Sequence, residues 1–288
     1  MINSPISKIN LEGREFFVKR DDLIDPHLAG NKYRKLYKLV KTSKEKYDTI
    51  ISYGGTQSNA MLAISALCKE KNWNFIYYTK PLSQTLKNEK EGNYATALSL
   101  GMIHQELESE VYRDFISAIR LNLDEKSLLI DQGGADAMAR EGVALLAQEI
   151  RDANLDIKAI ATPSGTGTTA LYLALELPEY RVYTSPSIGD KSYLLEQMSA
   201  LQKVPSNLCI LEPLKKYHFA KPYQEFLEIY EKLCKEGIEF DLLYAPLLWQ
   251  RLLSSTTENI LYVHSGGVSG NISMLKRYVK KGLLKSSS

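Results

Sequence analysis

The amino-acid sequence predicts an α/β fold in which parallel sheets are flanked by helices. Short apolar runs typical of strands alternate along the chain with longer segments typical of helices, as in strand–helix–strand units. Three of these strands run into a glycine-rich turn and then directly into a helix, at residues 49–67, 157–177 and 260–282. With 288 residues and 44% hydrophobic content, the chain can bury a large core in one or two domains.

The first functional segment is a helix predicted to start near Asn31. Asn31 can cap the helix by accepting a hydrogen bond from a backbone amide, and the apolar residues that follow recur at helical spacing from Tyr33. Lys32 lies in the first turn. The helix dipole and neighbouring cations both disfavour an ammonium there, so we expect the pKa of Lys32 to lie below its ordinary value of about 10.4. A neutral amine can attack a carbonyl, whereas a solvated basic helix is the alternative interpretation.

The first strand-turn-helix unit comprises a strand at 49–52, a turn at 53–59 and an apolar helix at 60–67. Ser58 or Asn59 can cap this helix. Free backbone amides and small polar side chains at a helix start suit an anion such as a substrate carboxylate. An ordinary structural turn is the alternative, since such a turn needs glycine and a cap in any case.

The second unit comprises a strand at 157–161, a turn at 162–169 and a helix at 170–177 that ends before Pro178. The turn alternates glycine with threonine over Gly165, Thr166, Gly167 and Thr168. Glycines let the backbone approach a phosphate, and hydroxyls and the helix dipole favour its charge. The turn lacks the third glycine of a dinucleotide site and the lysine of an ATP-type loop, so it predicts a phosphate site without a lysine.

The third unit comprises a strand at 260–264, a turn at 265–271 and a helix from residue 272 to Gly282. Ser265 stands at the carboxyl end of the strand, where open α/β sheets bind their ligands. His264 has two interpretations. It is either a catalytic group or a partly buried side chain whose hydrogen bond goes to a backbone carbonyl.

Composition limits the class of protein. A net charge of +2 argues against nucleic acid as a partner. The three cysteines, Cys68, Cys209 and Cys234, are widely spaced and suggest neither a disulfide framework nor a zinc site, so no metal is expected. The start of the sequence lacks the features of a signal peptide, and no apolar run approaches ~18 residues. We therefore expect a cytoplasmic protein that has no membrane partner.

Four motifs together carry a family resemblance. They are Lys-Arg-Asp-Asp-Leu at 19–23, Gly-Asn-Lys with Arg-Lys-Leu at 30–36, Gly-Gly with Gln-Ser-Asn at 54–59, and His-Ser-Gly-Gly at 264–267. In these motifs the sequence resembles the fold-type II pyridoxal phosphate enzymes, which are tryptophan synthase β-like, and among them the 1-aminocyclopropane-1-carboxylate deaminase and D-cysteine desulfhydrase family. The resemblance implies a discontinuous large domain, 1–38 with 128–288, and a small domain, 39–127.

The resemblance also implies the role of the cofactor pyridoxal 5'-phosphate and of the residues that bind it. Lys32 would hold the cofactor covalently and later move protons on the substrate. Asn59 would bond the ring hydroxyl, and Ser265 would face the ring nitrogen. Residues 165–168 would bind the phosphate.

Substrate binding and catalysis are implied at two further places. Gln57, Ser58 and Asn59 would bind the substrate carboxylate, and Ser58 would assist catalysis. The family has a tyrosine over the cofactor ring in an Asp-Pro-Val-Tyr segment, and Tyr244 of residues 241–244 matches it. Lys32, Ser58 and Tyr244 are therefore the predicted catalytic residues.

Two departures bear on the reaction. Ala245 stands where cyclopropane deaminases have an acidic residue facing the ring nitrogen, and Ala60 stands where the family has a histidine. A ring without a carboxylate partner is a milder electron sink, which suits elimination from a substrate with a good leaving group. We expect a homodimer acting on D-cysteine, with cyclopropane ring opening as the alternative. Two other classes stay open: a cofactor-binding protein without turnover, and an α/β protein that binds another phosphorylated ligand.

Overall fold

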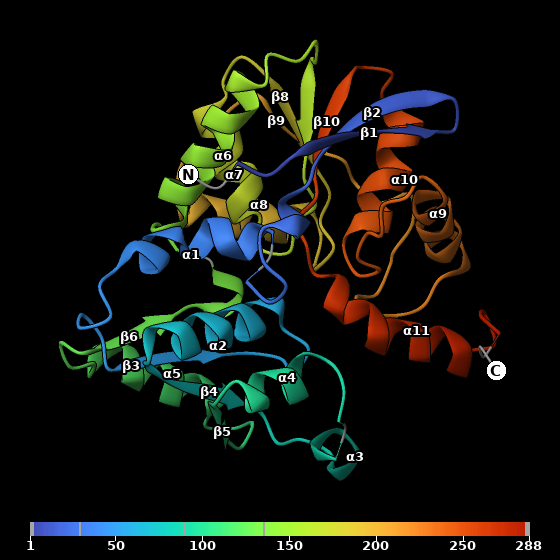
Figure 1. Cartoon of the computed structure of the whole chain (residues 1–288). Helices are drawn as coiled ribbons and strands as arrows, with labels where there is room; N and C mark the ends of the chain where they lie inside the picture. Colours follow the sequence, from blue (N-terminus) through green and yellow to red (C-terminus); the bar gives the residue numbers. More distant parts are fainter. Residues whose placement is uncertain (1–2, 29, 89, 135, 286–288) are drawn as a thin grey trace.

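The computed structural model describes residues 3–28, 30–88, 90–134 and 136–285, and it confirms the predicted α/β class. Figure 1 shows two sheets, one in the upper half of the view and one in the lower half, with helix α1 (Asn31–Lys41) between them. Both sheets carry helices on their faces. Each sheet therefore has its own apolar core, and α1 contacts both halves.

The larger sheet has six strands in the order β1-β2-β10-β7-β8-β9. The strands β1 and β2 pair antiparallel, and all the other pairs are parallel. The strand bounds are β1 (Ile6–Leu11), β2 (Arg14–Lys19), β7 (Ala159–Ala161), β8 (Arg181–Thr184), β9 (Leu208–Ile210) and β10 (Ile260–Val263). The strands predicted at 157–161 and 260–264 correspond to β7 and β10, and the structure shows that they are neighbours in one sheet.

The smaller sheet has four parallel strands in the order β5-β4-β3-β6. Their bounds are β3 (Thr49–Tyr53), β4 (Asn74–Thr79), β5 (Met102–Glu106) and β6 (Ser127–Ile130). The sequence places a domain boundary at residue 128, but β6 pairs with β3 along its whole length. The sheet therefore extends to residue 130, and the domain division itself stays a prediction.

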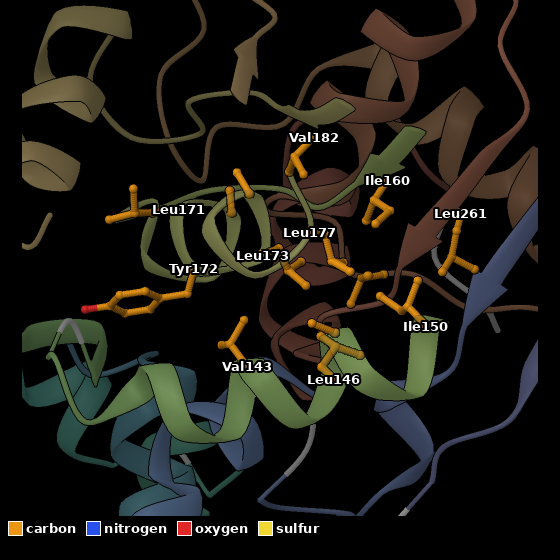
Figure 2. Packing of buried hydrophobic residues seen from close by; sticks show 14 of the residues in the cluster. Val143, Leu146, Ile150, Ile160, Leu171, Tyr172, Leu173, Leu177, Val182 and Leu261 are labelled. Carbon is orange, nitrogen blue, oxygen red and sulfur yellow. The ribbon is translucent and has the colours of Figure 1, made fainter. Parts of the chain in front are cut away.

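One face of the larger sheet packs against helices α6 (Ala139–Asp152), α7 (Thr168–Glu176) and α8 (Lys191–Ser199). Figure 2 shows Val143, Leu146 and Ile150 of α6 meeting the α7 side chains, with Ile160 and Leu261 of the sheet above them. These side chains are almost completely excluded from water. Burial of this kind contributes roughly 1.5–3 kcal/mol for each large apolar side chain.

The other face of the larger sheet packs against α9 (Gln224–Lys235) and α10 (Ala245–Ser255), and α11 (Asn271–Lys280) contacts α9 through a small apolar cluster. The smaller sheet packs against α1, α2 (Asn59–Lys71) and α4 (Asn93–Ser99). The remaining helices are α3 (Gln84–Lys87) and α5 (Tyr112–Leu121). None of the helices that the structure describes is long and apolar enough to cross a membrane.

Candidate active site

A cavity of about 300 Å³ lies where segments that follow strands of both sheets come together. Residues after β3 and β6 line it from the smaller sheet, and residues after β7 and β10 line it from the larger sheet. The cavity collects every residue predicted for the site: Lys32, Gln57, Ser58, Asn59, Gly165, Thr166, Gly167, Thr168, Tyr244 and Ser265. Their roles stay predictions, but their convergence follows from the fold.

Helix α1 starts differently from the prediction. Gly30, not Asn31, is the N-cap, with a φ of 58°, and no side chain caps the helix. A side chain at Gly30 would collide with the backbone oxygen of Ser265, which would lie 2.0 Å from its Cβ. The Asn31 amide instead donates to that oxygen at 3.1 Å. The start of α1 is therefore attached directly to the turn that follows β10.

Lys32 points into the cavity, and its Nζ donates to the Gly133 carbonyl at 3.4 Å. Burial lowers the pKa of Lys32 to about 8. The predicted direction is confirmed, and desolvation by burial, which the sequence did not indicate, is the largest cause. A larger fraction of this amine is neutral near pH 7 than for an ordinary lysine.

Lys35 is a second lysine of the cavity, which the sequence prediction missed. It is only 4% exposed, and its Nζ donates to Gly133 O at 3.1 Å and to Thr166 Oγ1 at 3.4 Å. Burial, and then the charge of Lys32, lower its pKa well below the ordinary value. The sequence predicts that the glycine–threonine loop binds a phosphate without a lysine, but Lys35 Nζ bonds to Thr166 of this loop. The signal in the sequence is the i, i+3 spacing from Lys32, which places both on one face.

A buried ionic network holds the opposite side of α1. Arg34, which is 1% exposed, donates to both carboxylate oxygens of Asp21, at 2.8 and 2.9 Å, and also to Glu149 of α6. Lys19 of β2 pairs with the same Glu149 at 2.8 Å. The Lys-Arg-Asp-Asp and Arg-Lys-Leu motifs thus meet in one network, and α1 is not a solvated basic helix.

The Gln-Ser-Asn turn begins helix α2. Ser58 is its N-cap, and its Oγ accepts from the Met61 amide at 3.2 Å. Asn59 is the first helical residue, and its Oδ1 accepts from Asn93 at 2.8 Å. The small polar side chains predicted to bind a carboxylate therefore stand at a helix start that faces the cavity.

The glycine–threonine loop begins helix α7. Its N-cap is Gly167, with a φ of 76°, and no side chain caps the helix. The first-turn amides therefore have no intrahelical acceptor and can bind an anion. Thr169 adds a buried hydroxyl for which the described residues offer no partner. This arrangement fits the predicted phosphate.

Tyr244 also lines the cavity, and its ring is 3.3 Å from where a Cβ at Gly165 would stand. Burial, and then the nearby Asp241 carboxylate, raise its pKa. Asp241 Oδ1 accepts from the Tyr244 and Leu243 amides at 2.6 and 3.0 Å, which holds the segment in place. Ala245 is buried in the core beneath the larger sheet and is not among the cavity residues.

His264 is not part of the cavity lining. It is 1% exposed, its Nε2 lies 2.8 Å from the Glu239 carbonyl oxygen, and its Nδ1 accepts from the Gly266 amide. Burial lowers its pKa, so the ring is neutral near pH 7. These contacts support the structural interpretation, in which the histidine shapes the turn that presents Ser265.

The charge of the cavity indicates its ligand class. Its described lining residues include three basic side chains, Lys32, Lys35 and Arg277, and no aspartate or glutamate. An amine that can form a covalent bond to an aldehyde thus shares one cavity with an uncapped helix start and more basic than acidic side chains. These residues fit pyridoxal phosphate, which carries an aldehyde and a phosphate. Among the described residues, no cluster of three histidine, cysteine or acidic side chains could hold a metal ion.

Known proteins are similar to this chain along most of its length. No protein-family model matches the sequence. A putative 1-aminocyclopropane-1-carboxylate deaminase of Thermotoga maritima is 27% identical over 299 aligned positions, which cover 93% of each chain. A D-cysteine desulfhydrase of Serratia proteamaculans is 24% identical, over 88% of this chain and 87% of that protein.

Solved structures show the same fold. The crystal structure of a 1-aminocyclopropane-1-carboxylate deaminase homologue superposes with a TM-score of 0.77 at 22% identity, over 96% of this chain and 94% of the other. The predicted resemblance is confirmed. The chain is related along nearly its whole length to the 1-aminocyclopropane-1-carboxylate deaminases and D-cysteine desulfhydrases, and it has the fold of the type II pyridoxal phosphate enzymes.

Proposed function

We propose that the protein is a pyridoxal phosphate-dependent lyase that deaminates a small amino acid, and that D-cysteine is its substrate. One observation carries the proposal: the Lys32 amine, with a pKa of about 8, shares a cavity with the uncapped start of α7. The first group can hold an aldehyde, and the second can hold its phosphate.

The chain's own groups have separate tasks. Lys32 would hold the cofactor and, when released by substrate, would move a proton at the substrate α-carbon. Lys35 and the amides at the start of α7 would bind the phosphate, and the Tyr244 ring would pack over the cofactor ring. Gln57, Ser58 and Asn59 would bind the substrate carboxylate. When bound, pyridoxal phosphate supplies an electron sink for the α-carbon.

The choice of D-cysteine rests on which residue would face the ring nitrogen of the cofactor. Ala245 lies in the core, and no acidic residue is among the described residues that line the cavity. Ser265 would then face the ring nitrogen, and a hydroxyl partner leaves the ring a milder electron sink. Elimination of a sulfur leaving group needs less stabilisation than ring opening. D-cysteine and water would give pyruvate, ammonia and hydrogen sulfide.

Absorbance spectroscopy tests the proposal. Protein reconstituted with pyridoxal phosphate is expected to show a visible absorbance band that Lys32→Ala lacks. D-cysteine, L-cysteine and 1-aminocyclopropane-1-carboxylate are then added separately, with pyruvate, 2-oxobutanoate and sulfide as readouts. Pyruvate and sulfide from D-cysteine would support the proposal, and 2-oxobutanoate from the cyclopropane substrate would favour the alternative. A band without turnover would indicate a binding protein, and the absence of any band would refute the cofactor.

We further propose a homodimer in the cytoplasm, as the family resemblance suggests. The cysteines support the cytoplasmic location, because disulfides are rare in a reducing cytoplasm and all three cysteines are free in the structure. Burial also raises the pKa of the Cys68 thiol, which keeps it protonated. Sedimentation velocity of the reconstituted protein would give its mass directly. A monomer at micromolar concentration would refute the proposed dimer and leave the cofactor proposal intact.

A further inference from the structure

We propose that Asn93 is a positioning residue that fixes the direction in which the Asn59 amide faces the cavity. Asn93 is the first residue of α4, is completely buried and is not among the residues that line the cavity. It acts through Asn59, which the resemblance pairs with the cofactor ring hydroxyl. The inference rests on the proposed cofactor and adds a residue that the four motifs do not include.

The orientation of the Asn93 amide follows from an acceptor that cannot change its role. Asn93 Nδ2 lies 3.0 Å from the backbone oxygen of Gln57, and a backbone carbonyl can only accept. The amide nitrogen of Asn93 must therefore face Gln57. On its other side, Asn93 Oδ1 accepts from Ser269 Oγ at 2.8 Å. Both ends of this side chain are thus held, and a flipped amide would lose the bond to Gln57.

The second hydrogen of Asn93 Nδ2 sets the orientation of Asn59. It points to Asn59 Oδ1 at 2.8 Å, so this oxygen is turned toward Asn93. Asn59 Nδ2 must then face the opposite way, toward the turn after β10. A Cβ at Gly267 would come within 2.5 Å of it. Among the described residues this Nδ2 makes no hydrogen bond, so its hydrogens are available to a ligand.

Asn59 lines the cavity, and because its Oδ1 is bonded to Asn93, the group that it can offer to a ligand there is the Nδ2 donor. The ring oxygen of pyridoxal phosphate carries negative charge when ionised, and a donor stabilises that form, whereas an amide oxygen would repel it. Asn93 belongs to the smaller sheet's helices, and Ser269 follows β10 of the larger sheet. The chain of bonds from Ser269 through Asn93 to Asn59 therefore crosses between the two halves of the molecule.

Two substitutions test this assignment. Asn93→Asp keeps the shape but removes the amide donor, and Asn93→Leu removes it without adding charge. In both, the Asn59 amide loses its partner and can turn its oxygen to the cavity. We expect the dissociation constant of pyridoxal phosphate, measured by equilibrium dialysis, to rise at least about tenfold. We also expect the pH midpoint of the visible band of bound cofactor to move upward, because a ring oxygen without a donor holds its shared proton more tightly.

Controls separate positioning from folding. Ser269→Ala removes only the bond to Asn93 Oδ1 and leaves the Gln57 contact, so cofactor affinity is expected to change less than about threefold. The decisive comparison is made in an Asn59→Ala background, where Asn93→Leu should cause no further loss of affinity. Urea unfolding of each apoprotein shows whether the variant is folded.

The outcomes distinguish the two proposals. If the wild-type protein does not bind pyridoxal phosphate, both the proposed function and this inference fall. If the wild type binds it but both Asn93 variants keep wild-type affinity and pH midpoint, only the inference is overturned. An Asn93→Leu effect that persists in the Asn59→Ala background would also overturn it, because Asn93 would then act on the fold and not through Asn59.

Discussion

Lys32 and Lys35 lie one helical turn apart, and burial in one cavity determines the chemistry of both. Each Nζ donates to the Gly133 carbonyl. Desolvation lowers both pKa values, most strongly for Lys35, where the charge of Lys32 adds to the effect. A dianionic ligand would relieve this repulsion. These two lysines therefore suit an anionic ligand that carries an aldehyde.

The pKa of Lys32 predicts how fast the apoprotein captures pyridoxal phosphate. Only the neutral amine attacks the aldehyde, so the capture rate should rise about tenfold per pH unit below the pKa of about 8 and level off above it. At pH 7 about a tenth of the amine is neutral, against roughly one part in 2,500 for an ordinary lysine. Stopped-flow absorbance across this pH range gives the midpoint.

Two controls accompany that measurement. Nα-acetyl-lysine, measured with pyridoxal phosphate under the same conditions, corrects for the titration of the cofactor itself. Lys32→Ala should show no absorbance change from covalent capture of pyridoxal phosphate. A midpoint near 10 would contradict the desolvated lysine.

At the scale of elements, helix α1 is placed by ionic contacts on one side and apolar contacts on the other. Tyr33, Leu36 and Leu39 pack into the core of the smaller sheet. Arg34 binds Asp21 and Glu149, which belong to the larger half. The helix that carries Lys32 is therefore held from both directions, and its start cannot move without breaking buried ion pairs.

The buried network should dominate the stability of α1. Asp21→Asn removes one partner of the pair with Arg34 and leaves a guanidinium buried with one carboxylate fewer. We expect the free energy of unfolding to fall by about 3–5 kcal/mol. Urea denaturation of the apoprotein measures it.

An exposed ion pair between α1 and α6 offers a matched control for this buried pair. Lys41 of α1 and Glu141 of α6 lie 3.9 Å apart with side chains 61% and 46% exposed. Lys41→Met should cost less than about 1 kcal/mol, since solvent screens exposed pairs. Comparable losses in Lys41→Met and Asp21→Asn would show that burial does not determine the strength of these contacts.

At the scale of the whole molecule, the candidate site draws on both sheets, so ligand binding should stabilise both. The segments after β3 and β6 face those after β7 and β10 across one cavity. A ligand that contacts all four segments stabilises the native state relative to every state in which either half of the molecule is unfolded.

This arrangement predicts the pattern of amide exchange on cofactor binding. Pyridoxal phosphate at a hundredfold excess over its dissociation constant should raise the free energy of unfolding by about 2.7 kcal/mol. Hydrogen exchange should slow at the starts of both α2 and α7. Inorganic phosphate, as the control ligand, should protect only the start of α7. Protection by the cofactor confined to the larger half would contradict a site shared by both sheets.

Local elements were predicted well from sequence because their signals are local. The helix expected at 170–177 is α7, Thr168–Glu176, and the strand at 49–52 is β3, Thr49–Tyr53. Residues that meet only in space were missed. Lys35 belongs to the site because its Nζ bonds to Thr166 of the loop before α7, and Asn93 because α4 packs against α2. The spacing of Lys35 from Lys32 places both on one helix face, but the partners of Lys35 and Asn93 lie far away in the sequence, so no local pattern indicates these contacts.

By itself, the sequence determined the α/β class, the three strand-turn-helix units and the residues that carry the family resemblance, because propensity, glycine turns and motif spacing are properties of short segments. The tertiary structure decided the rest. It buried Lys32, which lowers the pKa of that amine, placed Lys35 beside Thr166, and put Ala245 in the core. Burial and hydrogen-bond direction depend on which distant segments pack together, and no local pattern specifies that.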